Sequence, residues 1–112
     1  MTDLGETTVQ HHSAALLNYA LWARMCGRLA RPLPPPVAAG AAAHERLPPE
    51  ARATVAAYAD RCWALVCDEA AVAAHDAGEA GVRQAALRQR MPHLDDWTAA
   101  VLWNQAYRLA MQ

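Results

Sequence analysis

The sequence predicts an all-α protein, a compact bundle of four to five helices around a long central helix at about residues 50–76. Three observations support this fold class. The stretch from Pro49 to Asp76 contains no glycine and no internal proline. Its apolar side chains recur every three or four residues, which is the period of one helical face. Alanine, the strongest helix former, supplies 28 of the 112 residues. The length of the chain suits a single domain that spans residues 1–112.

The central helix is apolar over more than half of its circumference, leaving a narrow polar strip around Asp60, Arg61 and Asp68. Such a helix normally packs against neighbours on both sides, so we place it at the centre of the bundle. We expect it to end at about Asp76, because Gly78 follows closely and glycine often terminates helices. Its predicted core face comprises Val55, Tyr58, Ala59, Cys62, Leu65, Val66, Glu69, Ala70 and Ala73.

The chain before the central helix is predicted to form two helices. Residues 1–8 are interpreted as a flexible polar leader. The first helix extends over residues 9–30, until the proline-rich connector at 31–36 stops it, because proline disfavours helix at itself and at the preceding residue. Residues 37–46 form a short second helix that Gly40 weakens. The core stripe of the first helix is Leu17, Leu21, Met25 and Leu29.

The chain after the central helix is predicted to form a helical pair. A short basic helix spans residues 81–91, and Pro92 and His93 end it. Asp95 or Asp96 then caps a final helix over residues 97–111, since aspartate is a favoured N-cap. The core face of this last helix is drawn through Ala99, Leu102, Ala106 and Leu109, with Trp103 and Ala110 alongside.

A second stripe on the last helix carries side chains typical of binding surfaces. Trp97, Val101, Asn104 and Arg108 follow one another at spacings of three or four residues, so they share one face. Tryptophan and arginine are enriched at protein interfaces, and asparagine and arginine can also contact bases and phosphates. This face is therefore a candidate partner surface, although Trp97 could instead simply cover the end of the bundle.

Charge and composition narrow the function classes. The net charge is −1, which argues against a protein that simply coats nucleic acid. The chain has no lysine, which excludes Schiff-base and phosphate-loop lysine chemistry. The N-terminus lacks the pattern of a signal peptide and no apolar run reaches the length of a membrane span, so we expect a cytoplasmic protein without membrane contact. We interpret Cys26, Cys62 and Cys67 as reduced core thiols.

Catalytic and metal-binding patterns are absent from the sequence. Ser13 is the only serine and has no glycine elbow, and the five glycines are isolated. None of the five histidines lies in a Glu-x-x-His or His-x-x-x-His arrangement, so they are interpreted as solvated or capping residues. We therefore predict a protein that is not an enzyme and has no cofactor, no metal and no small-molecule substrate.

Two segments carry a resemblance to a known family. The last two predicted helices and the turn at Pro92 have the shape of a degenerate helix-turn-helix, and Asn18 to Arg24, NYALWAR, contains a Trp-x-Arg helix. Together they resemble small phage antitermination-type regulators. The resemblance implies a role in transcription control, with nucleic acid or the transcription machinery as partner. It would place Arg83, Arg88, Arg90 and Arg108 on phosphates and Asn104 near bases.

Two hypotheses follow, and they require different environments for the arginines. A regulator that binds nucleic acid through its C-terminal helices should gather Arg83, Arg88, Arg90 and Arg108 into one basic patch. A homodimeric adaptor or structural protein that makes only protein contacts should instead pair these arginines with the acids of the central helix.

Overall fold

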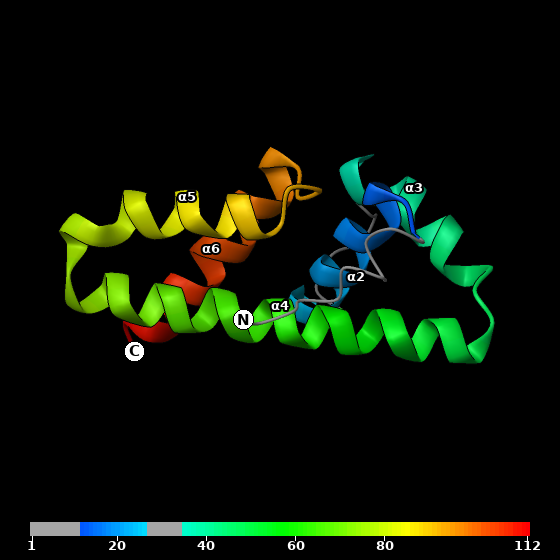
Figure 1. The fold of residues 1–112 in the computed structure, drawn as a ribbon, viewed down its shortest axis with the longest axis horizontal. Helices are drawn as coiled ribbons and strands as arrows, with labels where there is room; N and C mark the ends of the chain where they lie inside the picture. The colour runs from blue at the N-terminus through cyan, green and yellow to red at the C-terminus, as the bar shows by residue number, and fades with distance from the viewer. Residues whose placement is uncertain (1–11, 27–34) are drawn as a thin grey trace.

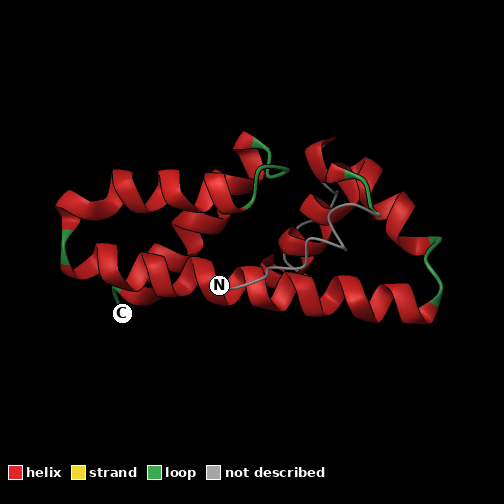
Figure 2. Ribbon diagram, viewed as in Figure 1, coloured by secondary structure: helices red, strands yellow, loops and turns green. Residues whose placement is uncertain are grey.

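The computed structural model describes residues 12–26 and 35–112, which form five α-helices and one 3-10 turn (Figure 1). Within residues 35–112 short loops join consecutive helices, and the described residues contain no strand (Figure 2). The all-α prediction is confirmed. The helices are α2 (Ala14–Cys26), α3 (Pro35–Glu45), α4 (Pro49–His75), α5 (Ala80–Arg90) and α6 (Asp96–Ala110), with the turn η1 (Ala77–Glu79) between α4 and α5. Among the described residues, no helix combines the length and the hydropathy that a membrane span requires.

The long helix α4 runs the length of the molecule and contacts α2, α5 and α6 (Figure 1). The longest dimension of the structure is 42 Å. Helix α5 folds back antiparallel to α4, while α3 packs on α2. The predicted central helix is thus confirmed, with its start and end each one residue earlier than expected. Its buried residues are Val55, Tyr58, Ala59, Cys62, Val66, Ala70 and Ala73, which belong to the predicted core face.

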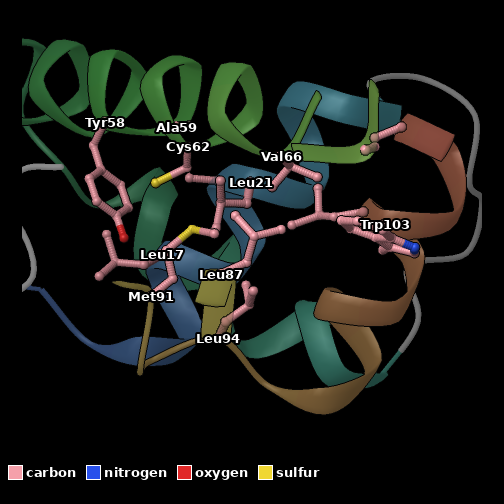
Figure 3. Close-up of a cluster of buried hydrophobic side chains, with 14 of the residues drawn as sticks. Leu17, Leu21, Tyr58, Ala59, Cys62, Val66, Leu87, Met91, Leu94 and Trp103 are labelled. Carbon is pink, nitrogen blue, oxygen red and sulfur yellow. The ribbon is translucent and has the colours of Figure 1, made fainter. Parts of the chain in front are cut away.

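The core collects one apolar face from each of four helices (Figure 3). Leu17 and Leu21 of α2 are fully buried beneath α4, as their spacing predicts. Leu87 of α5 and Leu102 of α6 close the other end of the core, with 5% and 1% of their surface exposed. Since much of the α4 face is alanine, close approach of the helices supplies packing that larger side chains would provide elsewhere.

The opposite side of α4 corrects the expectation that this helix is packed on both sides. Ala57, Ala64 and Ala71 are exposed there, together with Arg61 and Asp68. Alanine buries little apolar area, so an alanine face can remain in water at small cost in free energy. The apolar residues of this helix therefore led us to predict a wider buried face than the bundle covers.

Glycine at position 40 has a packing role that its low helix propensity does not suggest. Helix α3 crosses α2 so closely that a Cβ atom at Gly40 would overlap the backbone oxygen of Ala15 and lie 2.6 Å from Cβ of Tyr19. Only glycine permits this approach. The Tyr19 ring also faces His44, with ring centroids 5.3 Å apart, and burial lowers the pKa of that histidine.

Several predicted boundaries need correction. Pro35 and Pro36 belong to the first turn of α3, where a missing N–H is tolerated, and not to the connector. Helix α4 ends at His75 with Asp76 as its C-cap, and Gly78 lies beyond it in η1. Leu109 is 47% exposed, because the buried residues of α6 end at Ala106 and its last turn extends past the core. The leader, Leu29 and positions 31–34 of the connector lie outside the described residues.

Candidate functional site

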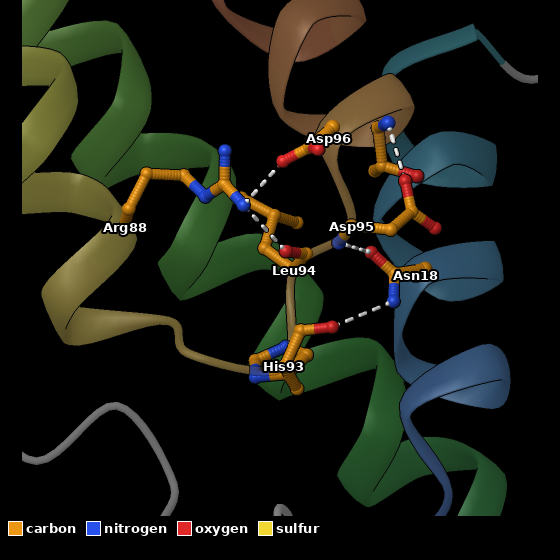
Figure 4. Close-up of polar contacts among 7 residues, drawn as sticks. Asn18, Arg88, His93, Leu94, Asp95 and Asp96 are labelled. Atoms are coloured by element: carbon orange, nitrogen blue, oxygen red, sulfur yellow. Dashed lines mark hydrogen bonds and ion pairs between the residues drawn. The ribbon is translucent and has the colours of Figure 1, made fainter.

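The loop between α5 and α6 is held by a buried side chain from α2. Asn18 is only 2% exposed. Its Nδ2 donates to the carbonyl oxygen of His93 at 3.0 Å, and its Oδ1 accepts from the backbone N–H of Asp95 at 3.1 Å (Figure 4). The Nδ2 also donates to the carbonyl oxygen of Ala14 at 2.7 Å. The carboxamide thus satisfies two backbone groups of the loop, as a neighbouring strand would, and connects the loop to α2.

The same loop is held to α4 through a histidine and a tyrosine. Nε2 of His93 lies 2.7 Å from the hydroxyl oxygen of Tyr58, which is 1% exposed. Burial lowers the pKa of His93 and raises the pKa of Tyr58, so both groups are neutral in this contact. The expectation of a solvated or capping histidine is therefore wrong at position 93. Burial also raises the pKa of the adjacent Cys62 thiol to about 11, which keeps that thiol protonated and unreactive.

The start of α6 is fixed by two aspartates with different partners. Asp95 is the N-cap, and its carboxylate accepts from the backbone N–H of Thr98 at 2.6 Å. Asp96 accepts from Arg88 of α5 at 2.8 Å, and the same guanidinium donates to the carbonyl oxygen of Leu94 at 3.2 Å (Figure 4). The capping prediction is confirmed for Asp95, while Asp96 links the beginning of α6 to α5.

An open apolar cavity lies between α5 and α6, next to α4, and is called the α5–α6 groove below. Its volume is about 200 Å³. The floor is formed by buried side chains, namely Val66, Leu87, Met91, Leu94, Leu102 and Trp103. Its rim carries the exposed residues Gln84, Arg88, Asp96 and Ala100. The groove thus combines an apolar interior with an ion pair at its edge.

The predicted arginines have different surroundings. Arg83 donates to Glu69 of α4 at 3.0 Å and lies 3.8 Å from Glu79. Arg88 pairs with Asp96, whereas Arg90 is exposed and has no ion-pair partner in the described residues. At about 100° per residue, Arg83 and Arg90 lie on one flank of α5 and Arg88 lies on the other.

The predicted stripe on α6 does not line the groove. Trp97 and Val101 are half-buried, while Asn104 and Arg108 are exposed. At about 100° per residue, all four point away from Leu102, and the groove is bordered by the other flank of the helix. The seven predicted site residues therefore lie on three surfaces. Arg83 and Arg90 lie on one flank of α5, the four residues of the stripe lie on α6, and only Arg88 belongs to the groove.

Sequence reasoning missed the residues that hold this site together. Asn18 falls directly after Leu17 and four residues before Trp22, inside the buried arc of α2. A lone amide in such an arc was the available signal, because a buried amide requires partners. The floor of the groove was missed for another reason, since Val66, Leu102 and Trp103 were interpreted only as core.

No group of three histidine, cysteine, aspartate or glutamate side chains that could hold a metal occurs within residues 12–26 and 35–112. Cys62 and Cys67 do not bridge to each other. Comparisons of the chain with protein-family models, curated proteins and solved structures find no match.

Proposed function

We propose that the protein is a small non-enzymatic adaptor that binds another protein through the α5–α6 groove. The observation that carries this proposal is the open cavity with a wholly apolar floor and the exposed Arg88–Asp96 pair on its rim. Interfaces concentrate binding energy where one large side chain enters such a pocket and a polar rim excludes water.

The volume of the groove indicates what enters it. Small-molecule and cofactor sites usually measure about 300–1,000 Å³. A cavity of about 200 Å³ is below that range and suits one large apolar side chain presented by a partner helix or loop. The occupant we propose is therefore a leucine-, phenylalanine- or tryptophan-sized anchor on another protein.

The charge on the rim adds a second requirement. The Asp96 side chain is 95% exposed, so its attraction to Arg88 is weakened by water and can be replaced at little cost. A carboxylate beside the anchor of the partner can take the place of Asp96 on the guanidinium. The partner segment is thus expected to carry an acidic residue next to its apolar side chain.

The second candidate function is a regulator, of phage type, that engages nucleic acid or the transcription machinery through α5 and α6. The exposed Asn104 favours it, as do the exposed Arg90 and Arg108, neither of which forms an ion pair in the described part of the chain. The pairing of Arg83 with Glu69 of α4 favours the adaptor instead, because an internal carboxylate already occupies that guanidinium. A protein of the transcription machinery would satisfy both proposals.

The test uses helical peptides with a leucine anchor flanked by glutamate, titrated into the 15N-labelled protein and followed by NMR. We expect shifts at Gln84, Ala100 and the Trp103 indole, and loss of binding in Ala100→Trp, which fills the groove. Ala110→Trp is the matched control, since it adds the same side chain to an exposed position of α6 outside the groove.

The peptide result also separates the two candidates. Binding that Ala100→Trp leaves unchanged would refute the groove proposal. Replacing the flanking glutamates by lysine should weaken binding, because a lysine cannot pair with the Arg88 guanidinium. A parallel titration with mixed duplex DNA supports the regulator instead if it shows salt-sensitive binding that Arg90→Glu with Arg108→Glu abolishes.

A further inference from the structure

The outer side of α4 carries a regular series of exposed residues that the adaptor groove does not use. It is called the α4 seam here and comprises Thr54, Ala57, Arg61, Ala64, Asp68, Ala71 and His75. All seven are exposed. They alternate at spacings of three and four residues over roughly 32 Å of helix, at about 1.5 Å per residue. Helix α4 lies along one long edge of the molecule (Figure 1), and the exposure of all seven residues places the seam on its outer side.

This spacing is the heptad pattern by which two helices pack along their length. Thr54, Arg61, Asp68 and His75 occupy one repeat position, and the three alanines occupy the other. Alanine lets the axes of two helices approach to about 8 Å, the short end of the usual range. It buries little apolar area, however, so the two charged residues decide whether and how a second helix packs here.

From the seam we infer that two copies of this chain associate through antiparallel packing of their α4 helices. A two-fold axis beside Ala64 brings Arg61 of each copy opposite Asp68 of the other and sets Ala57 opposite Ala71 of the second copy. In a parallel pair, Arg61 would face Arg61 and Asp68 would face Asp68. Coulomb attraction therefore selects the antiparallel arrangement, and like-charge repulsion opposes the parallel one.

Both charges are available for this contact. Neither Arg61 nor Asp68 takes part in an ion pair within the described residues. The neighbouring Asp60 differs, since it pairs with Arg24 of α2 and is thereby held at the edge of the seam. A second copy of the chain supplies the complementary charges without any other partner, which is why we choose it as the occupant.

The experiment is light scattering coupled to size exclusion, at several protein concentrations and low salt. We expect the wild type to reach the mass of two 12.1 kDa chains as concentration rises. Arg61→Asp and Asp68→Arg should each shift the protein to the monomer mass, since each places like charges opposite each other. The double variant Arg61→Asp with Asp68→Arg should restore the dimer, because it exchanges the two charges. The matched control Arg46→Asp reverses an exposed arginine outside α4 and should remain dimeric.

Circular dichroism of each variant is compared with that of the wild type, so a variant that is monomeric because it folds poorly is recognised. The double variant then tests whether exchanging the two charges restores the dimer. A wild type that stays monomeric at every concentration would overturn the inference. A dimer that survives either single reversal, or a folded double variant that stays monomeric, would overturn it as well. Ala100→Trp fills the groove and should leave the mass of the dimer unchanged. Peptide binding therefore tests the groove proposal, and the mass tests the dimer, independently of each other.

Discussion

Replacing Asn18 by alanine should destabilise the protein far more than any surface change on the same helices. The substitution removes the carboxamide that bonds the carbonyl oxygen of His93 and the N–H of Asp95. It leaves both backbone groups without their partner in a part-buried site. The third contact, to Ala14, is to an oxygen within α2 itself and matters less, since that carbonyl lies in the helical ladder.

The magnitude follows from those two backbone groups. Leaving a buried donor or acceptor unsatisfied costs about 1–3 kcal/mol. Two such groups in a part-buried site give a loss of about 2–4 kcal/mol. The higher helix propensity of alanine returns roughly 0.5 kcal/mol, so the net loss remains large beside a typical stability of about 5–15 kcal/mol.

Urea unfolding followed by circular dichroism measures this loss directly. Asn104→Ala is the matched control, because it makes the same chemical change at an exposed position of α6, and it should alter the free energy of unfolding by less than about 0.5 kcal/mol. An Asn18→Ala loss below about 1 kcal/mol, similar to that of the control, would refute the role assigned to this side chain.

Three further predictions concern the core and the loop. Gly40→Ala should destabilise the protein, since the added Cβ overlaps α2. Gly81→Ala should stabilise α5 by roughly 0.5–1 kcal/mol, because the space around Gly81 is open. Equal effects of the two substitutions in urea unfolding would contradict this. Thr98→Val should stabilise by about 1 kcal/mol, because the buried Thr98 hydroxyl has no hydrogen-bond partner in the described structure, and a lower midpoint would count against it. The pKa of His93 is lowered from 6.5 by burial, so the unfolded state binds protons more readily and stability should fall as pH drops below about 6.5. His93→Gln should flatten this dependence, and an unchanged pH profile in that variant would exclude His93 as its source.

The periodicity of apolar residues was sufficient to predict most of the helices. The three-and-four spacing located α4 to within one residue at each end, and the buried residues of α4 belong to the predicted face. Helix α6 shows the limit of that reasoning. Leu109 has the right angular position for the core, but burial also requires a neighbour at that height, and the spacing of one helix does not reveal where the next helix ends.

The polar contacts of the site could not be predicted in the same way. Asn18 and Asp95 are 77 positions apart, and no pattern in either helix indicates that they meet. Tyr58 and His93 likewise come together only because α5 folds back along α4. A sequence shows that a polar residue lies on an apolar face and needs a partner, whereas the identity of the partner depends on how the helices cross.

The two proposed surfaces lie on opposite sides of the same helix. Val66 contributes to the floor of the groove, and at about 100° per residue it lies roughly 160–180° around α4 from Ala57 and Ala64 of the seam. Packing along the seam would therefore leave both grooves of a dimer open and facing away from each other. Asn18 and His93 fix the α5–α6 loop before any partner arrives, which lowers the ordering cost of binding at each groove. Two preformed grooves on one rigid dimer would suit a partner that presents two anchors, since the second contact would then be intramolecular.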